Sequence, residues 1–235
     1  MNFRIGHVTH TGIKRDHNED TYGINHKDQI WLVADGMGGH DHGELASAMA
    51  RDSILFHYSS GETVKNSILK SNQSIIDSSY ERGGDLPMGT TIVVLTIKGN
   101  KFYATWVGDS RIYRFHDNKL IPITTDHSYV QELVDQKLIT EEQARTHPHR
   151  NVVTQALGVT DNSEIHISIA DGNLKVGDKF LLCSDGLTEE VDDSKLEEII
   201  SNEFNPQEIS DQMTIQALKS GGSDNITVII LEVVE

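Results

Sequence analysis

Short apolar runs that end in polar turns recur along the chain and predict β-strands. The clearest runs cover residues 30–35, 90–124, 179–185 and 225–234. Inside the long run, the pairs Gly99-Asn100 and Asp117-Asn118 separate apolar stretches, and these residue types accept the tight turns of β-hairpins. Strands joined by hairpins pair in antiparallel fashion, so residues 90–124 are expected to form a meander.

Apolar residues at helical spacing predict helices between these strands. Leu45, Met49 and Phe56 would share the buried face of a first helix, and a similar stripe from Val64 to Tyr80 predicts a second. Strands grouped in meanders, with helices apart from them, favour an α+β layered fold over a doubly wound parallel sheet.

A third helix is marked by its capping residues. Asn205 can cap its start, Pro206 suits the first helical position, and Gly221 with Gly222 would end it. Residues 125–157 differ from the rest because they are polar, contain two short helical pieces and interrupt the strand pattern. We interpret this segment as a helical insertion or lid.

Length and charge narrow the class of protein. A chain of 235 residues fits one domain with a sizeable core. Its formal charge of −16 argues against a nucleic-acid partner, which would require a basic face. No apolar run is long enough to span a membrane, and the first residues lack the apolar core of a signal peptide. The single cysteine, Cys183, fits a reducing cytoplasm and is expected to be a small buried residue.

Aspartates recur where predicted strands begin or end. They are Asp20, Asp35, Asp109, Asp185 and Asp224. Clustered carboxylates repel one another unless protons, basic side chains or cations pair them. Oxygen ligands select Mg²⁺ or Mn²⁺ over zinc, and Gly36 could expose a backbone carbonyl as a further ligand. Asp-Gly is also a common turn dipeptide, so on the residues alone a metal site and a set of turns stay open alternatives.

An ordered series of motifs resembles one known family over essentially the whole chain. The motifs are "RDHNEDTYG", "LVADGMGGHDHGELAS", "GTTIVVL", "WVGDSRIYRF", "LLCSDGLTEEV" and "GGSDNITVIIL". They resemble the bacterial branch of the metal-dependent serine/threonine phosphatases, the PP2C or PPM family. The resemblance implies a central β-sandwich of two antiparallel sheets flanked by helices. It also implies a single catalytic domain over residues 1–235, with a flap at about 125–157.

The resemblance also implies a set of metal ligands for two or three Mn²⁺ or Mg²⁺ ions. Asp35 would bridge two ions, with the Gly36 carbonyl as a further ligand. Asp185 and Asp224 would complete one shell, and Asp20 would help to hold the other ion through water. Asp109 would form a third site together with Asp185.

Roles outside the metal shell follow from the same resemblance. Arg15 matches the arginine that grips the substrate phosphate, although in isolation it would be interpreted as a surface residue paired with Asp16 or Glu19. Glu19 would contact and support the metal ligands without binding a metal ion itself. Animal members carry a histidine where this chain has Met37, and methionine cannot act as a general acid. His40 is a candidate substitute, as is a metal-bound water.

The expected function is hydrolysis of phosphoserine and phosphothreonine in proteins by a metal-activated water. One alternative is a metal-dependent phosphoesterase for nucleotides or other small molecules, and another is a catalytically silent phosphoprotein-binding regulator. Phosphorylated proteins, including substrates of a serine/threonine kinase, are the expected partners. The chain is expected to be a cytoplasmic monomer that binds neither nucleic acid nor membrane.

Overall fold

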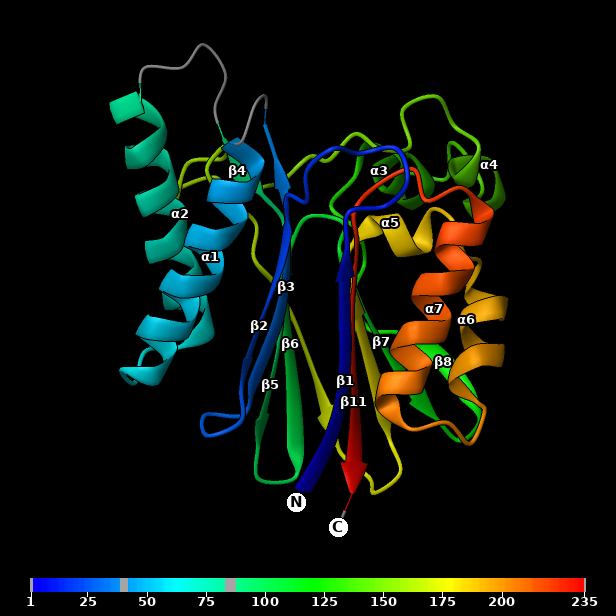
Figure 1. Ribbon diagram of the computed structural model, residues 1–235. Helices are drawn as coiled ribbons and strands as arrows, with labels where there is room; N and C mark the ends of the chain where they lie inside the picture. The colour runs from blue at the N-terminus through cyan, green and yellow to red at the C-terminus, as the bar shows by residue number, and fades with distance from the viewer. Residues whose placement is uncertain (1, 39–41, 83–87, 235) are drawn as a thin grey trace.

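A computed structural model describes residues 2–38, 42–82 and 88–234, which fold into four layers (Figure 1). Two antiparallel sheets pack face to face, and a pair of helices covers the outer side of each. One sheet has the strand order β1-β11-β10-β7-β8, and the other has the order β2-β3-β5-β6-β9 with β4 paired to β3. The predicted β-sandwich with flanking helices is therefore confirmed.

The strands of the first sheet are β1 (Asn2–His10), β11 (Ile226–Val234), β10 (Lys179–Cys183), β7 (Arg111–His116) and β8 (Lys119–Pro122). Those of the second are β2 (Asp20–Asn25), β3 (Ile30–Met37), β4 (Gly89–Thr90), β5 (Ile92–Lys98), β6 (Lys101–Val107) and β9 (Ser168–Asn173). The central strands β3, β5, β10 and β11 are buried along most of their length. This double-sided burial explains why they appear in the sequence as continuous apolar runs.

The core between the sheets is aromatic and aliphatic. Phe180 from β10 meets Phe102 from β6 edge to face, with ring centroids 5.0 Å apart. Trp31 from β3 packs in the same core and is fully buried. Separate apolar clusters lie between each sheet and its helices, so three cores hold the four layers together.

Helices α1 (His42–Ser59) and α2 (Val64–Arg82) cover the second sheet, whereas α6 (Asp193–Ile200) and α7 (Pro206–Ser220) cover the first. The caps predicted for α7 are present, because Asn205 accepts hydrogen bonds from Gln207 and Glu208 and Gly221 follows the last turn. The predicted face of α1 is right for Leu45 and Met49, which are partly buried against the core, and wrong for Phe56. Its buried stripe runs through Ala46, Ala50 and Ile54, and Phe56 is 68% exposed.

Small residues explain why the buried stripe of α1 differs from the predicted one. Alanines at the contact let the helix lie close to the sheet, and that close contact determines which face is buried more strongly than the larger apolar residues do. Strands β1 and β9 were missed because both are edge strands with mixed burial. An edge strand keeps polar residues and therefore lacks the apolar run of a central one.

The polar insertion holds the two short helices that the sequence indicated, α3 (Tyr129–Asp135) and α4 (Glu141–Arg145). They lie beside the short α5 (Asp185–Thr188), at the upper end of the sandwich (Figure 1). Arg145 of α4 reaches Asp192 and Asp193 at the start of α6, which links the insertion to the helical layer. Among the helices of the described residues, none is both long and apolar enough to cross a membrane.

Phe180 provides a test of the core between the sheets. The change Phe180→Ala should lower the free energy of unfolding by about 3–5 kcal/mol, because it opens a cavity in the contact with Phe102. Phe56→Ala on the exposed face of α1 is the matched control and should change stability by only about 0.5 kcal/mol. Urea unfolding measures both, and equal losses would contradict the assignment of the α1 faces.

Candidate functional site

Asp20 and Asp35 form the centre of the candidate site. They lie directly opposite each other in the β2–β3 pair, at one end of the second sheet. Strand β3 continues past Asp35 through Gly36 to Met37, where it pairs with β4. The apolar run at residues 30–35 had predicted a strand that ends at Asp35, and this end was wrong, because the strand continues and gains β4 as a new partner.

The backbone of Asp35 is held by two threonines. Its carbonyl accepts hydrogen bonds from Thr91 N at 2.8 Å and from Thr90 Oγ1 at 2.9 Å. Its amide donates to Thr91 Oγ1 at 3.2 Å. The Thr91 hydroxyl also meets Ser110 Oγ at 2.7 Å, next to Asp109. The threonines therefore connect the strand of one aspartate to the turn that carries another.

The first sheet contributes two more aspartates from neighbouring strands. Asp185 follows β10 at the start of α5, and Asp224 lies just before β11. A Cβ on Gly186 would lie 2.0 Å from the carbonyl oxygen of Asn225, so only glycine allows this approach of the two segments. Ser184 Oγ donates to Asp20 Oδ2 at 2.6 Å and thereby connects the two sheets.

Asp109 enters from the turn after β6. The preceding Gly108 has φ +105°, a backbone conformation that favours glycine. His127 fixes this turn, because its backbone amide donates to the Gly108 carbonyl at 2.9 Å and its Nδ1 accepts from the Gly108 amide at 3.2 Å. His127 Nε2 bonds to Ser168 Oγ at 3.0 Å. His127 therefore has a structural role, since its ring and its backbone hold the turn that carries Asp109.

Mutual repulsion shows that the aspartates converge. Burial, together with repulsion from nearby carboxylates, raises the pKa of Asp20 to about 7 and that of Asp185 to about 6. Burial also raises the pKa of Asp35 well above its ordinary value, with added repulsion from Asp20, Asp185, Asp109 and Asp224. The pKa of Asp109 is raised well above its ordinary value by burial and by Asp185.

The donor set fits hard divalent cations. Asp20 Oδ1 and Asp185 Oδ1 are buried and accept no hydrogen bond from the described residues. A buried charged oxygen without a partner is costly, so these atoms call for a cation or a proton. Within the described residues no three His, Cys, Asp or Glu side chains form a cage by themselves. Water and carbonyl ligands would complete the shell, as is usual for Mg²⁺.

Gly36 and Glu19 have structural tasks that the sequence did not reveal. A Cβ on Gly36 would lie 2.1 Å from the carbonyl oxygen of Gly43, so the start of α1 requires a glycine there. The Gly36 amide donates to the Glu19 carbonyl at 3.1 Å. Burial raises the pKa of Glu19, which Arg15 and the Gly43 amide counteract. Glu19 therefore ties the start of α1 to the entry of β2.

Arg15 lies in the connection between β1 and β2 and pairs with Asp224, Nη2 to Oδ2, at 2.6 Å. The alternative pairing with Asp16 or Glu19 is not the one observed, and the Arg15 side chain remains 49% exposed. Met37 is half-buried at the end of β3. His40 lies outside the described residues.

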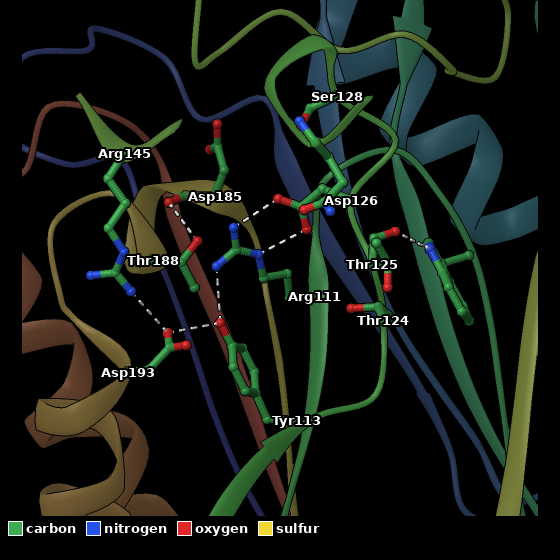
Figure 2. Close-up of polar contacts among 12 residues, drawn as sticks. Arg111, Tyr113, Thr124, Thr125, Asp126, Ser128, Arg145, Asp185, Thr188 and Asp193 are labelled. Carbon is green, nitrogen blue, oxygen red and sulfur yellow. Dashed lines mark hydrogen bonds and ion pairs between the residues drawn. The ribbon is translucent and has the colours of Figure 1, made fainter. Parts of the chain in front are cut away.

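A polar network beside Asp109 was not anticipated (Figure 2). Arg111 forms a two-pronged ion pair with Asp126 at 2.8 and 2.7 Å, and it also donates to the Tyr113 hydroxyl at 3.0 Å. That hydroxyl donates to Asp193 Oδ1 at 3.1 Å. Arg111, Asp126 and Asp193 of this network line a cavity of about 510 Å³ that reaches Asp109 and Asp185. The motif "GDSR" contained Arg111, but its partner lies in the insertion, beyond what spacing can show.

Comparison with known proteins gives a consistent result. The family model for protein phosphatase 2C matches residues 10–219. A serine/threonine phosphatase from Listeria welshimeri is 36% identical over 240 residues, covering 95% of this chain and 93% of that protein. The crystal structure of the Mycobacterium tuberculosis serine/threonine phosphatase PstP/Ppp has a TM-score of 0.91 at 31% identity, over 99% of both chains. A structure of the PstP catalytic domain in complex with two manganese ions has a TM-score of 0.87 at 31% identity, over 99% of both chains.

The hydrogen bonds of His127 predict a pH-dependent contribution to stability. Burial and His166 lower the pKa of His127 from 6.5 to about 4, with Asp126 acting in the opposite direction. The neutral imidazole is therefore favoured in the folded state. Its contribution is complete above pH 6.5 and is lost as the pH falls from 6.5 through about 4, because protonation of Nδ1 breaks the bond from Gly108.

The variant His127→Gln isolates this effect, because its side chain stays neutral throughout. At pH 7 it should unfold with a free energy about 1–2 kcal/mol below that of the wild type. Urea titrations between pH 7 and 4.5 should show this difference shrinking towards the acid end. A difference that stays constant with pH would rule out the titration of His127.

Proposed function

The chain belongs to the protein phosphatase 2C family of metal-dependent serine/threonine protein phosphatases, and from that premise we propose how its own residues serve the reaction. The observation that carries the proposal is the convergence of five aspartates, two of whose buried carboxylate oxygens have no hydrogen-bond partner among the described residues. The comparisons favour proteins as substrates over nucleotides or other small molecules. They do not favour a catalytically silent regulator.

The aspartates and one carbonyl would hold the ions. Asp35 would bridge two ions with help from the Gly36 carbonyl, Asp185 and Asp224 would complete one shell, and Asp20 would serve the other through water. Asp109 with Asp185 would hold a third. Divalent cations at such a site supply an activated water for attack on phosphorus and neutralise charge on the phosphoryl group. We favour Mn²⁺ or Mg²⁺ on the all-oxygen ligand set, and the two manganese ions of the similar PstP structure support this choice.

Arg15 would bind and orient the phosphate. Its planar guanidinium presents a fork of donors that matches phosphate oxygens, and half of the side chain is open to solvent. Asp224 accepts from one nitrogen, Nη2, which fixes the direction of the group beside the aspartates. Positioning of this kind supplies much of the rate enhancement in phosphoryl transfer.

The proton donor to the leaving serine or threonine oxygen is a separate question. Met37 lies at the expected place and has no titratable group. His40 stays our candidate, with a metal-bound water as the second. Since His40 lies outside the described residues, a substitution at this position is needed to test its role as the proton donor.

The proposal also covers the flap, the extent of the domain, the partners and the location of the enzyme. Residues 125–157 would act as a flap that contacts the protein substrate, because they line the cavity next to Asp109 and Asp185. The whole chain, 1–235, would be one catalytic domain. The partners would be phosphoproteins, including those of a serine/threonine kinase, and the single cysteine supports a cytoplasmic setting. We expect a monomer without nucleic-acid or membrane contacts.

Asp35→Ala tests the metal site. Removal of the bridging carboxylate should lower kcat with Mn²⁺ and a phosphopeptide by at least about 1,000-fold. Without metal the variant should unfold no more easily than the wild type, because one repelling charge is gone. Mn²⁺ should raise the melting temperature of the wild type more than that of the variant, and a chelator should abolish wild-type activity.

The matched control for this experiment is Asp77→Ala, which removes an exposed aspartate from α2. It should behave as the wild type in rate and in its response to Mn²⁺. Rates of the Asp35 variant within about threefold of the wild type would refute its bridging role.

Arg15→Ala tests phosphate binding. Loss of charge-assisted hydrogen bonds of about 1.5–3 kcal/mol should raise KM for a phosphopeptide about 10- to 100-fold. The thermal shift caused by Mn²⁺ should remain. Arg4→Ala is the control, since Arg4 on β1 is exposed and pairs at 2.8 Å with the partly buried Glu232 rather than with an aspartate of the site. An unchanged KM for the Arg15 variant would remove this residue from the site.

A further inference from the structure

The connection that carries Arg15 contains no helix or strand between β1 and β2. It crosses from one sheet to the other at the upper end of the sandwich, where Figure 1 shows it as the blue arch above both strands. The residues around Arg15, from Ile13 to His17, are exposed. A segment of this kind needs specific contacts to stay in one conformation, because its backbone entropy opposes order.

The side-chain amide of Asn225 supplies three such contacts. Its Nδ2 donates to the Thr11 carbonyl at 2.8 Å and to the His17 carbonyl at 2.9 Å. Its Oδ1 accepts from the Glu19 amide at 2.8 Å. Asn225 is only 4% exposed, so the bonds are shielded from water. One buried amide therefore holds the start and the end of the Arg15 connection together.

The backbone beside Asn225 reinforces the same arrangement. The amides of Ile13 and Lys14 both donate to the Gly222 carbonyl, at 2.7 and 3.3 Å. A Cβ on Gly12 would lie 2.1 Å from the Asp224 carbonyl oxygen, which shows how closely the two segments approach. Arg15 itself reaches the Asp224 carboxylate. Asp224 thus receives the guanidinium, while the next residue holds the backbone from which that guanidinium extends.

We propose that Asn225 is a positioning residue that fixes the Arg15 connection in the conformation that binds phosphate. The inference deepens the function proposed above, and it rests on the role of Arg15 given there. Removal of the amide releases both ends of the connection and leaves the Thr11 and His17 carbonyls without their donor. The phosphate then binds to an arginine that occupies many positions. The affinity for the substrate therefore falls more than the rate of the chemical step does.

A second buried asparagine provides a matched control. Asn72 of α2 is fully buried and also makes three hydrogen bonds to a connection, at residues 158–162. Its partners are the Thr160 carbonyl at 2.8 Å, Asn162 Oδ1 at 2.8 Å and the Gly158 amide at 2.6 Å. A role in folding alone would make the two asparagines equivalent, whereas a positioning role separates them.

The kinetic experiment compares Asn225→Ala, Asn72→Ala, Arg15→Ala and the double variant of Asn225 and Arg15, with Mn²⁺ and a phosphopeptide. Asn225→Ala should raise KM about tenfold or more and change kcat by less than about threefold. Asn72→Ala should lower stability and leave KM unchanged. In the Arg15→Ala background, the Asn225 change should raise KM no further, because both changes remove the same interaction. An additive effect, or an equal rise in KM for Asn72→Ala, would overturn the proposal.

A second measurement is independent of activity. Lys14 and Arg15 are both trypsin sites, so cleavage after them reports the order of the connection under native conditions. Asn225→Ala should be cut there at least about tenfold faster than the wild type and Asn72→Ala, and an unchanged rate would overturn the proposal. If Asn225→Ala does not fold, Asn225→Asp replaces it, since it keeps the acceptor for Glu19 but loses both donors. A wild type without metal-dependent hydrolysis would refute the proposed function and leave the cleavage result valid.

Discussion

Repulsion among five aspartates at one end of the sandwich is the constraint on which the rest of the structure depends. Burial and neighbouring charges hold the pKa of Asp20 near 7 and that of Asp185 near 6, so these groups resist full ionisation in the absence of a cation. The fold holds them together because two packed sheets deliver strand ends to one place. The Asp35 amide donates a hydrogen bond to Thr91, which fixes the backbone of Asp35, and Ser184 donates to the side chain of Asp20. Divalent cations would relieve the same repulsion and provide the catalytic charge.

Close approach of backbones is the second condition of the site. Gly36 lies against Gly43, and Gly186 lies against Asn225, at separations that exclude any side chain. These contacts bring α1 to the second sheet and α5 to the first at the level of the carboxylates. The electropositive group comes separately, from an irregular connection that is hydrogen-bonded to Gly222 and Asn225, just before β11. A net charge of −16 over the chain is therefore compatible with the proposed recognition of phosphate, because bound cations and Arg15 would act locally.

Much of this arrangement could be predicted from the sequence. The central strands, the caps of α7 and the positions of the aspartates follow from apolar runs and turn residues. The edge strands β1 and β9 could not be recognised, since each keeps polar residues on its exposed parts. The centre of the buried face of α1 was missed because it contains the small residues Ala46 and Ala50, whereas Leu45 and Met49 at its side were recognised. The partners of Arg15, Arg111 and Asn225 are distant in the chain, so no spacing rule could reveal them. The role of His40 stays a prediction.

The central claim is that the converging aspartates hold divalent cations. Crystals grown with Mn²⁺, and measured at the manganese absorption edge, would test it directly through the anomalous difference map. At least two peaks are expected, with Asp35 in contact with both and Asp185 and Asp224 beside one of them. A map with no peak in contact with Asp35 would contradict it.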